Sequence, residues 1–151
     1  MKQKIRYLAL IPARGGSKEI PRKNIKIFSG KPLINWTIHQ ALQVKSIEKV
    51  IVSTDDEEIS EIAKIAGASV PFMRPKDISG DSSKTEEAII HAVNFLENKL
   101  NFDIENIILM QCTSPLRKIS SIKNAIKKFE MDNLDSLLSV VEFPSFFMGA
   151  K

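Results

Sequence analysis

Short apolar runs alternate along this sequence with longer segments whose apolar residues recur at helical spacing. The runs have the length and composition of buried strands and lie at residues 5–11, 49–53 and 106–110. The helical segments place apolar residues three and four positions apart and begin at residues 32, 54 and 83. This β-α-β-α order predicts an α/β fold with a doubly wound, mostly parallel sheet and helices on both faces.

Several residues predict where these elements begin and end. Thr54 with Glu57, and Ser83 with Glu86, have the spacing of capping boxes, which satisfy the first N–H groups of a helix. Gly67 is suited to ending the second helix. Two further strands are expected at residues 69–73 and 136–141. A last helix is expected to bury one face, which holds Ile122, Ala125, Ile126 and Phe129.

The loop that follows the first strand combines glycine with concentrated positive charge. Gly15 and Gly16 permit backbone conformations and close approaches that a side chain would prevent. Residues 1–31 contain nine Lys or Arg and one acid, whereas the remaining residues contain 13 basic and 17 acidic side chains. Amide groups and cations together bind phosphate oxygens, so this asymmetry favours an anionic ligand at the loop. The alternative is a basic turn that only faces solvent.

Other classes of protein fit the sequence poorly. The glycine patterns G-x-G-x-x-G and G-x-x-x-x-G-K-[ST] are both absent from it. The basic stretch has no interleaved aromatic residues, so nucleic acid is not an expected partner, and no apolar segment is long enough for a membrane span. The composition, 43% hydrophobic and 26% charged over 151 residues, is that of one globular domain. The single Cys112 excludes a disulfide framework and favours a cytoplasmic location.

Three loop segments resemble the cytidylyltransferases that activate sialic acid and related nonulosonic acids. The segments are IPARGGSKEIPRKN at 11–24, STDDEEI at 53–59 and QCTSPLR at 111–117, and the resemblance runs from about residue 5 to residue 141. It implies a Rossmann-like nucleotidyltransferase sheet. It also implies an enzyme that transfers CMP from CTP to an acidic nine-carbon sugar and releases pyrophosphate, with Mg²⁺ as cofactor. A homodimer is implied for the full-length enzyme.

The resemblance also implies roles for individual residues. Family positions that contact the triphosphate are matched by Arg14, Ser17, Lys18 and Lys23, and Arg14 and Lys23 are the expected catalytic residues. Positions around the cytosine ring are matched by Asn24, Arg74 and Thr85. Gln111 matches a position that binds the acceptor sugar. Taken without the resemblance, Thr85 could equally be a helix-start residue and Arg74 a surface residue.

Other polar residues have simpler explanations. Asp55 and Asp56 lie at a helix start, where acids are favoured, although the pair also has the chemistry of metal ligands. Arg22 either belongs to the residues that contact the triphosphate or only keeps the loop solvated. The two histidines, His39 and His91, lie within helices, and Cys112 is expected to be a small buried residue. Ser114, Pro115 and Arg117 are expected to shape the last loop, without a direct role for Arg117.

In the family, the acidic pair that holds the catalytic magnesium is expected beyond Lys151, together with the segment that completes the sugar pocket and the dimer contact. No metal ligand is therefore predicted within the chain, and residues 1–151 resemble the nucleotide-binding part of a single cytidylyltransferase domain, truncated at its carboxyl end. Activity of these residues alone is left open. The alternatives are a 3-deoxy-manno-octulosonate cytidylyltransferase and a non-catalytic nucleotide-binding fragment. The sequence does not choose among sialic, legionaminic and pseudaminic acids.

Overall fold

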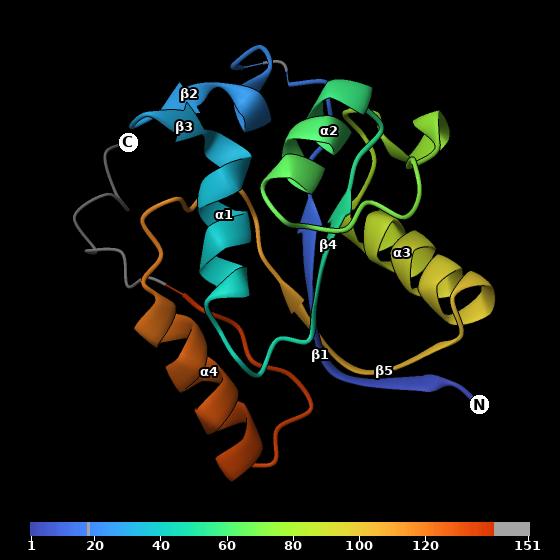
Figure 1. Ribbon diagram of the computed structural model, residues 1–151, viewed down its shortest axis with the longest axis vertical. Helices are drawn as coiled ribbons and strands as arrows, with labels where there is room; N and C mark the ends of the chain where they lie inside the picture. The colour runs from blue at the N-terminus through green and yellow to red at the C-terminus, as the bar shows by residue number, and fades with distance from the viewer. Residues whose placement is uncertain (18, 141–151) are drawn as a thin grey trace, which may run out of the picture. The chain divides into compact units, whose positions relative to one another are not determined.

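The computed structural model describes residues 1–17 and 19–140 (Figure 1). The chain divides into two compact units, Met1–Ile119 and Ser120–Lys151. The strand predicted at residues 136–141 is wrong over 136–140, which form neither helix nor strand. Its last residue lies outside the described residues.

A three-stranded parallel sheet forms the centre of the first unit. The middle strand, β1 (Gln3–Pro12), lies between β4 (Lys49–Ser53) and β5 (Phe102–Leu109). Leu10 of β1 is opposite Ile51 on one side and Leu109 on the other. The chain thus adds β4 to one edge of β1 and then returns to add β5 to the other edge. This reversal is the hallmark of a doubly wound sheet, and it confirms the predicted α/β class.

Helices cover the sheet from both sides, with α1 (Leu33–Leu42) and α3 (Thr85–Lys99) on opposite sides of the strands (Figure 1). The core on the α3 side contains Leu8 and Leu10 of β1 packed with Ala92 and Leu96 of α3. α1 buries Ile34, Ile38 and Ala41, which recur at helical spacing, whereas Leu42 is 48% exposed. Burial on both faces explains why β1 is apolar without alternation from Tyr7 to Ile11.

Two predicted helix caps are wrong by one or two residues. Asp56, rather than Thr54, caps α2 (Glu57–Ile65), because its Oδ1 accepts a hydrogen bond from the Ile59 N–H at 2.9 Å. At the start of α3, Glu87 accepts from the Lys84 N–H at 2.8 Å, one residue beyond the expected Ser83 and Glu86 pair. Gly67 ends α2 as predicted, with φ at +100°.

The strands differ from prediction at their edges. β5 begins at Phe102, four residues before the predicted run, because its first half alternates apolar with acidic residues, as a half-exposed strand does. Residues 69–73 join the sheet only through isolated parallel bridges, Ile51 with Ser69 and Thr54 with Met73. Small elements that were not predicted are the 3₁₀ helices η1 (Lys23–Ile25) and η2 (Lys76–Ile78) and a hairpin of β2 (Ile27–Phe28) with β3 (Lys31–Pro32).

The last helix, α4 (Ile119–Met131), is present where it was predicted. Ile122 and Ile126 of its predicted apolar face are buried. Within the described residues, no helix combines the length and apolar composition that crossing a membrane requires.

Candidate functional site

A cavity of about 290 Å³ lies where three loops meet at the carboxyl ends of the strands. One loop follows β1, the second runs from Arg74 to the start of α3, and the third follows β5. Doubly wound sheets bind their ligands at this edge, because the chain reversal there leaves a crevice between diverging loops. The three loops therefore converge at one edge of the sheet.

The cavity collects nearly all of the residues that the sequence singled out. Its lining includes Arg14, Ser17, Lys23, Asn24, Arg74, Thr85 and Gln111. Lys18 lies outside the described residues. Sequence reasoning missed Lys84, a further cation on the wall, although its place at the start of a helix beside Thr85 was a usable signal. The structure thus assembles one cationic cavity from segments far apart in the chain, and what each residue binds there stays a prediction.

Arg74 is a buried wall of this cavity rather than a surface residue, since only 8% of it is exposed. Its Nη2 donates to the Ser53 carbonyl oxygen at 3.1 Å, whereas its Nε has no hydrogen-bond partner among the described residues. Burial lowers the pKa of the guanidinium from its ordinary value, and Asp55 partly opposes that shift. A buried donor without a protein partner is suited to a ligand acceptor.

Arg14 and Asn24 are joined by a hydrogen bond across the base of the first loop. The Asn24 Nδ2 donates to the Arg14 carbonyl oxygen at 2.9 Å, so the two arms of the loop are held together. The Arg14 guanidinium extends to the second loop, where it donates to the Gly80 carbonyl oxygen at 2.7 Å and pairs with Asp81 at 3.0 Å. The protein's own carboxylate and carbonyl groups therefore contact the cation that was predicted to bind phosphate.

The third loop is held in shape by Arg117. Its Nη2 donates to the Gln111 carbonyl oxygen and its Nη1 to Gln40 Oε1 of α1, both at 3.1 Å. Gln40 in turn donates to the Pro115 carbonyl oxygen at 2.7 Å. Arg117 is not one of the residues that line the cavity. Its contacts are those of a residue that orients Gln111, in agreement with the supporting role expected from the sequence.

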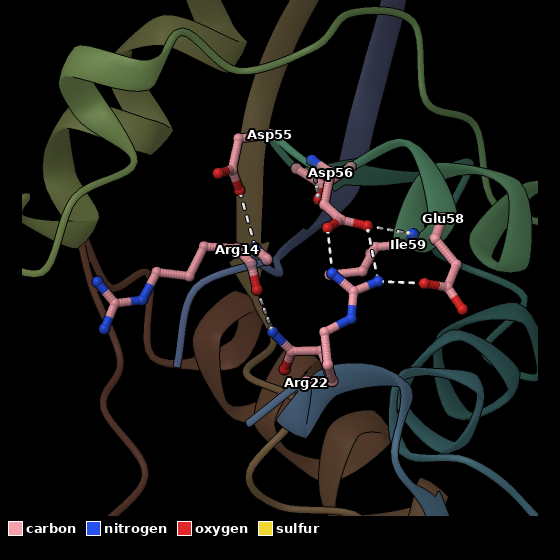
Figure 2. A network of polar contacts seen from close by, with 9 residues as sticks. Arg14, Arg22, Asp55, Asp56, Glu58 and Ile59 are labelled. Atoms are coloured by element: carbon pink, nitrogen blue, oxygen red, sulfur yellow. Dashed lines mark hydrogen bonds and ion pairs between the residues drawn. The ribbon is translucent and has the colours of Figure 1, made fainter. Parts of the chain in front are cut away.

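Asp55 and Asp56 have protein partners (Figure 2). The Gly15 N–H donates to Asp55 Oδ1 at 2.9 Å, while Asp56 caps α2 and forms an ion pair with Arg22. Hydrogen bonds from Arg22 lower the pKa of the Asp56 carboxyl below its ordinary value, against the effect of partial burial. Neither aspartate nor Arg22 lines the cavity. In the described part of the chain, no three His, Cys, Asp or Glu side chains group as a metal site would require.

The histidines and the cysteine have local roles. His39 contacts Lys31 and His91 packs edge-on against Phe72, and burial is the main cause of the lowered pKa of both imidazoles. Cys112 does line the cavity, but burial raises the pKa of its thiol to about 12. A thiol with such a pKa stays protonated at neutral pH and is not a nucleophile.

A family model described as cytidylyltransferase matches residues 8–143. A pseudaminic acid cytidylyltransferase of Campylobacter jejuni subsp. jejuni serotype O:23/36 is 39% identical over 139 residues, which are 92% of this chain and 60% of that protein. A CMP-N,N'-diacetyllegionaminic acid synthase of Legionella pneumophila is 41% identical over 82% of this chain and 53% of that protein. The chain thus spans between about half and three fifths of the length of these relatives.

A solved structure gives the same picture of the fold. It is titled as a CMP:2-keto-3-deoxy-manno-octonic acid synthetase complexed with CTP, and it superposes with a TM-score of 0.68 at 24% identity. The match covers 85% of this chain and 48% of that one.

Proposed function

Because this chain belongs to the cytidylyltransferase family, we propose that the protein transfers CMP from CTP to a sialic-acid-like nonulosonic acid and releases pyrophosphate. The observation that carries the proposal is the cavity itself, which brings Arg14, Lys23, Asn24, Arg74 and Gln111 together from three loops. The curated relatives support the substrate class, since their names specify pseudaminic acid and diacetyllegionaminic acid.

The cationic side of the cavity is the proposed site for the triphosphate of CTP. Arg14 offers a planar fork that matches phosphate oxygens, and Lys23 offers a compact charge. Ser17 is also on the cavity wall, and Lys18 is included in the proposal from the sequence. In the bound state, phosphate oxygens would replace Asp81 as the partners of Arg14.

The cytosine ring is proposed to lie against Asn24, Arg74 and Thr85. Cytosine presents an amino donor beside ring and carbonyl acceptors, so it needs both kinds of partner. Arg74 lines the cavity and supplies hydrogen-bond donors only. Asn24 is itself largely buried and carries both a donor and an acceptor.

The reaction we propose is an attack by the acceptor's anomeric hydroxyl oxygen on the α-phosphorus of CTP. A new oxygen–phosphorus bond forms, the bond from that phosphorus to the bridging oxygen breaks, and its electron pair leaves with pyrophosphate. The hydroxyl proton passes to solvent. Arg14 and Lys23 are the proposed catalytic residues, because they face the charge that grows on the leaving group. Gln111 is proposed to orient the acceptor from the third loop, and orientation lowers the barrier further.

Magnesium is proposed as the cofactor, entering as the complex of CTP. The described residues do not fit a protein-built metal site, since Asp55 and Asp56 are engaged by Gly15 and Arg22. No step above depends on the ion. A cytoplasmic location is likewise proposed, and the free, buried Cys112 supports it. A homodimer is proposed as well.

Nucleotide selectivity tests the first half of this proposal. Calorimetry with CTP, UTP, ATP and GTP in the presence of Mg²⁺ is expected to give the tightest binding for CTP. Equal affinities for the four nucleotides would contradict the proposed cytosine contacts.

Turnover tests the second half. Pyrophosphate release is measured with CTP and each of pseudaminic, legionaminic, N-acetylneuraminic and 3-deoxy-manno-octulosonic acids. Release with a nine-carbon acid is expected, whereas release only with the eight-carbon acid would favour the octulosonate alternative, whose synthetase has a similar fold. CTP-selective binding without release from any acid would indicate a nucleotide-binding module.

A further inference from the structure

Both arms of the loop between β1 and η1 attach to the same place, the junction between β4 and α2 (Figure 2). On the first arm, the Gly15 N–H donates to Asp55 Oδ1 at 2.9 Å. The fit there is close, because a Cβ at Gly15 would lie 2.6 Å from Asp56 Oδ2. The first arm therefore packs directly onto the two aspartates.

On the second arm, the Arg22 side chain contacts Asp56. Its Nη2 donates to Asp56 Oδ1 at 3.2 Å, and the guanidinium also forms ion pairs with Asp56 Oδ2 and with Glu58. The Arg22 backbone has φ at +56°, a left-handed conformation that side-chain-bearing residues adopt rarely. Surrounding contacts must stabilise such a conformation. The Arg22 carbonyl oxygen accepts hydrogen bonds from the Ile25 and Lys26 N–H groups, and the ion pairs add the contacts of its side chain.

Asp56 links the two arms to the helix as well. Its side chain is only 18% exposed and it accepts the capping hydrogen bond from Ile59. One carboxylate thus contacts the N-terminus of α2 and the guanidinium of the second arm, and it packs against Gly15 of the first. Figure 2 shows the Arg14 guanidinium extending away from this group of side chains.

We propose that Arg22 and Asp56 are positioning residues for the ligand-binding loop. We call this pair the clamp. It holds the two arms of the loop on the β4–α2 junction, and it thereby places Arg14 of the first arm, and Lys23 and Asn24 next to Arg22, at the cavity. Neither member of the pair lines that cavity. The inference rests on the proposed function for the identity of the ligand, but not for the existence of the clamp. Its physical basis is preorganisation, since a loop that is already ordered loses less entropy when it binds.

Two substitutions separate the clamp from other effects. Arg22→Asn removes the guanidinium but keeps a residue that tolerates the left-handed conformation. Asp56→Asn removes the charge but keeps a side chain that caps helices equally well. Glu61→Gln is the matched control, because it breaks an exposed ion pair with Lys64 on the same helix.

The experiment measures three quantities for the chain and its variants: amide hydrogen exchange of residues 13–24 without nucleotide, the Kd for CTP, and the melting temperature. Arg22→Asn and Asp56→Asn are each expected to accelerate exchange in the loop and to raise the Kd about tenfold. The melting temperature should change little in Arg22→Asn, because 42% of the Arg22 side chain is exposed, and it should fall in Asp56→Asn, because only 18% of that side chain is exposed. The double variant should resemble Arg22→Asn, because that substitution already removes the ion pairs of the guanidinium with Asp56 and Glu58.

The outcomes distinguish this inference from the proposed function. Loop exchange that is unchanged in both single variants overturns the clamp, whatever the chain binds. Faster exchange with an unchanged Kd overturns the claim that the clamp positions ligand-binding groups. Failure of the unsubstituted chain to bind CTP contradicts the proposed function, while faster loop exchange in the variants would still support the clamp. If Asp56→Asn prevents folding, Arg22→Asn alone decides the matter, since it leaves the helix cap intact.

Discussion

Arg74 donates a hydrogen bond from Nη2 to the carbonyl oxygen of Ser53, the last residue of β4, over 3.1 Å. The Arg74 backbone N–H also donates to the carbonyl oxygen of Thr54 at 2.7 Å. These two hydrogen bonds attach the second loop to the end of β4. The Arg74 side chain therefore both stabilises the fold and lines the cavity.

Arg74→Ala should therefore affect stability and binding together. The Ser53 carbonyl oxygen would keep the hydrogen bond from the Ala13 N–H and lose the one from Arg74. Loss of a hydrogen bond from a charged donor costs about 1.5–3 kcal/mol in the free energy of unfolding. Binding of CTP should weaken as well, because a cation on the cavity wall is lost. Urea unfolding and calorimetry measure the two effects. An unchanged free energy of unfolding would contradict the structural half of this role.

Arg14→Ala and Lys23→Ala should lower turnover far more than stability. One preorganised charge contact to a transition state is worth ~3 kcal/mol, on the order of a hundredfold in rate. The ion pair of Arg14 with Asp81 is partly exposed, and such pairs contribute only about 0–1 kcal/mol to folding. Pyrophosphate release and thermal melting are the measurements, and Lys64→Ala is the control for loss of an exposed cation. Normal turnover in both variants would mean that the loop is only a solvated basic turn.

Asp81→Asn should tighten the binding of CTP. Asp81 lines the cavity and contacts the guanidinium of Arg14. Its carboxylate therefore competes with phosphate for that cation and also repels the phosphate. A partly exposed ion pair of this kind contributes up to about 1 kcal/mol, so its removal should lower the Kd for CTP by up to roughly fivefold. Calorimetry at low and high salt measures the gain, which should shrink as salt screens the charges. Weaker binding would indicate that Asp81 contacts the ligand favourably.

Gly15→Ala should destabilise the chain, because the added methyl group would lie 2.6 Å from Asp56 Oδ2 and 2.9 Å from its Cβ. Overpacking of this kind typically costs about 1–3 kcal/mol. Gly16→Ala is the stability control, since a Cβ at Gly16 has no heavy atom within 4 Å. Urea unfolding of both variants is compared with the unsubstituted chain. Equal stability of the two variants would show that the loop is not packed against Asp56.

The stabilising effect of Asp56 should depend on pH at the acid end. Its carboxyl has a pKa below the ordinary 3.8 in the folded chain, mainly through the hydrogen bonds from Arg22. Such a group contributes its full stabilisation above 3.8, where it is ionised in both states, and loses it as the pH falls through the lowered value.

The difference in free energy of unfolding between the unsubstituted chain and Asp56→Asn is the quantity to follow. We expect it to be constant above about pH 5 and to shrink below pH 4. Glu61→Gln, in an exposed pair, controls for the general effect of removing a negative charge from α2. A difference that does not vary with pH would mean that the charge of Asp56 is not what stabilises the fold.

The elements that are set by local physical chemistry could be predicted from the sequence. β1 is an unbroken apolar run because both of its faces are covered, and α1 repeats buried residues at the helical period. The order of strands and helices then required a parallel sheet, which brings the polar loops to one edge. The individual residues came from the resemblance of the loop segments to a known family, and Lys84 and Asp81 are among the lining residues that it did not supply.

Only the tertiary structure decided which of several equivalent polar groups satisfy one another. Thr54 and Asp56 are both suitable caps by residue type, and Asp56 is the one in reach of the free Ile59 N–H. Arg22 had no partner that its neighbours in sequence could reveal, because its acid lies 34 residues away. Nothing in the local sequence distinguishes Arg74 from a surface cation. It is buried in the structure, where the second loop is hydrogen-bonded to the end of β4. Hydrogen bonds and ion pairs depend on distances of a few ångströms, which the fold sets and the spacing of residues along the chain does not.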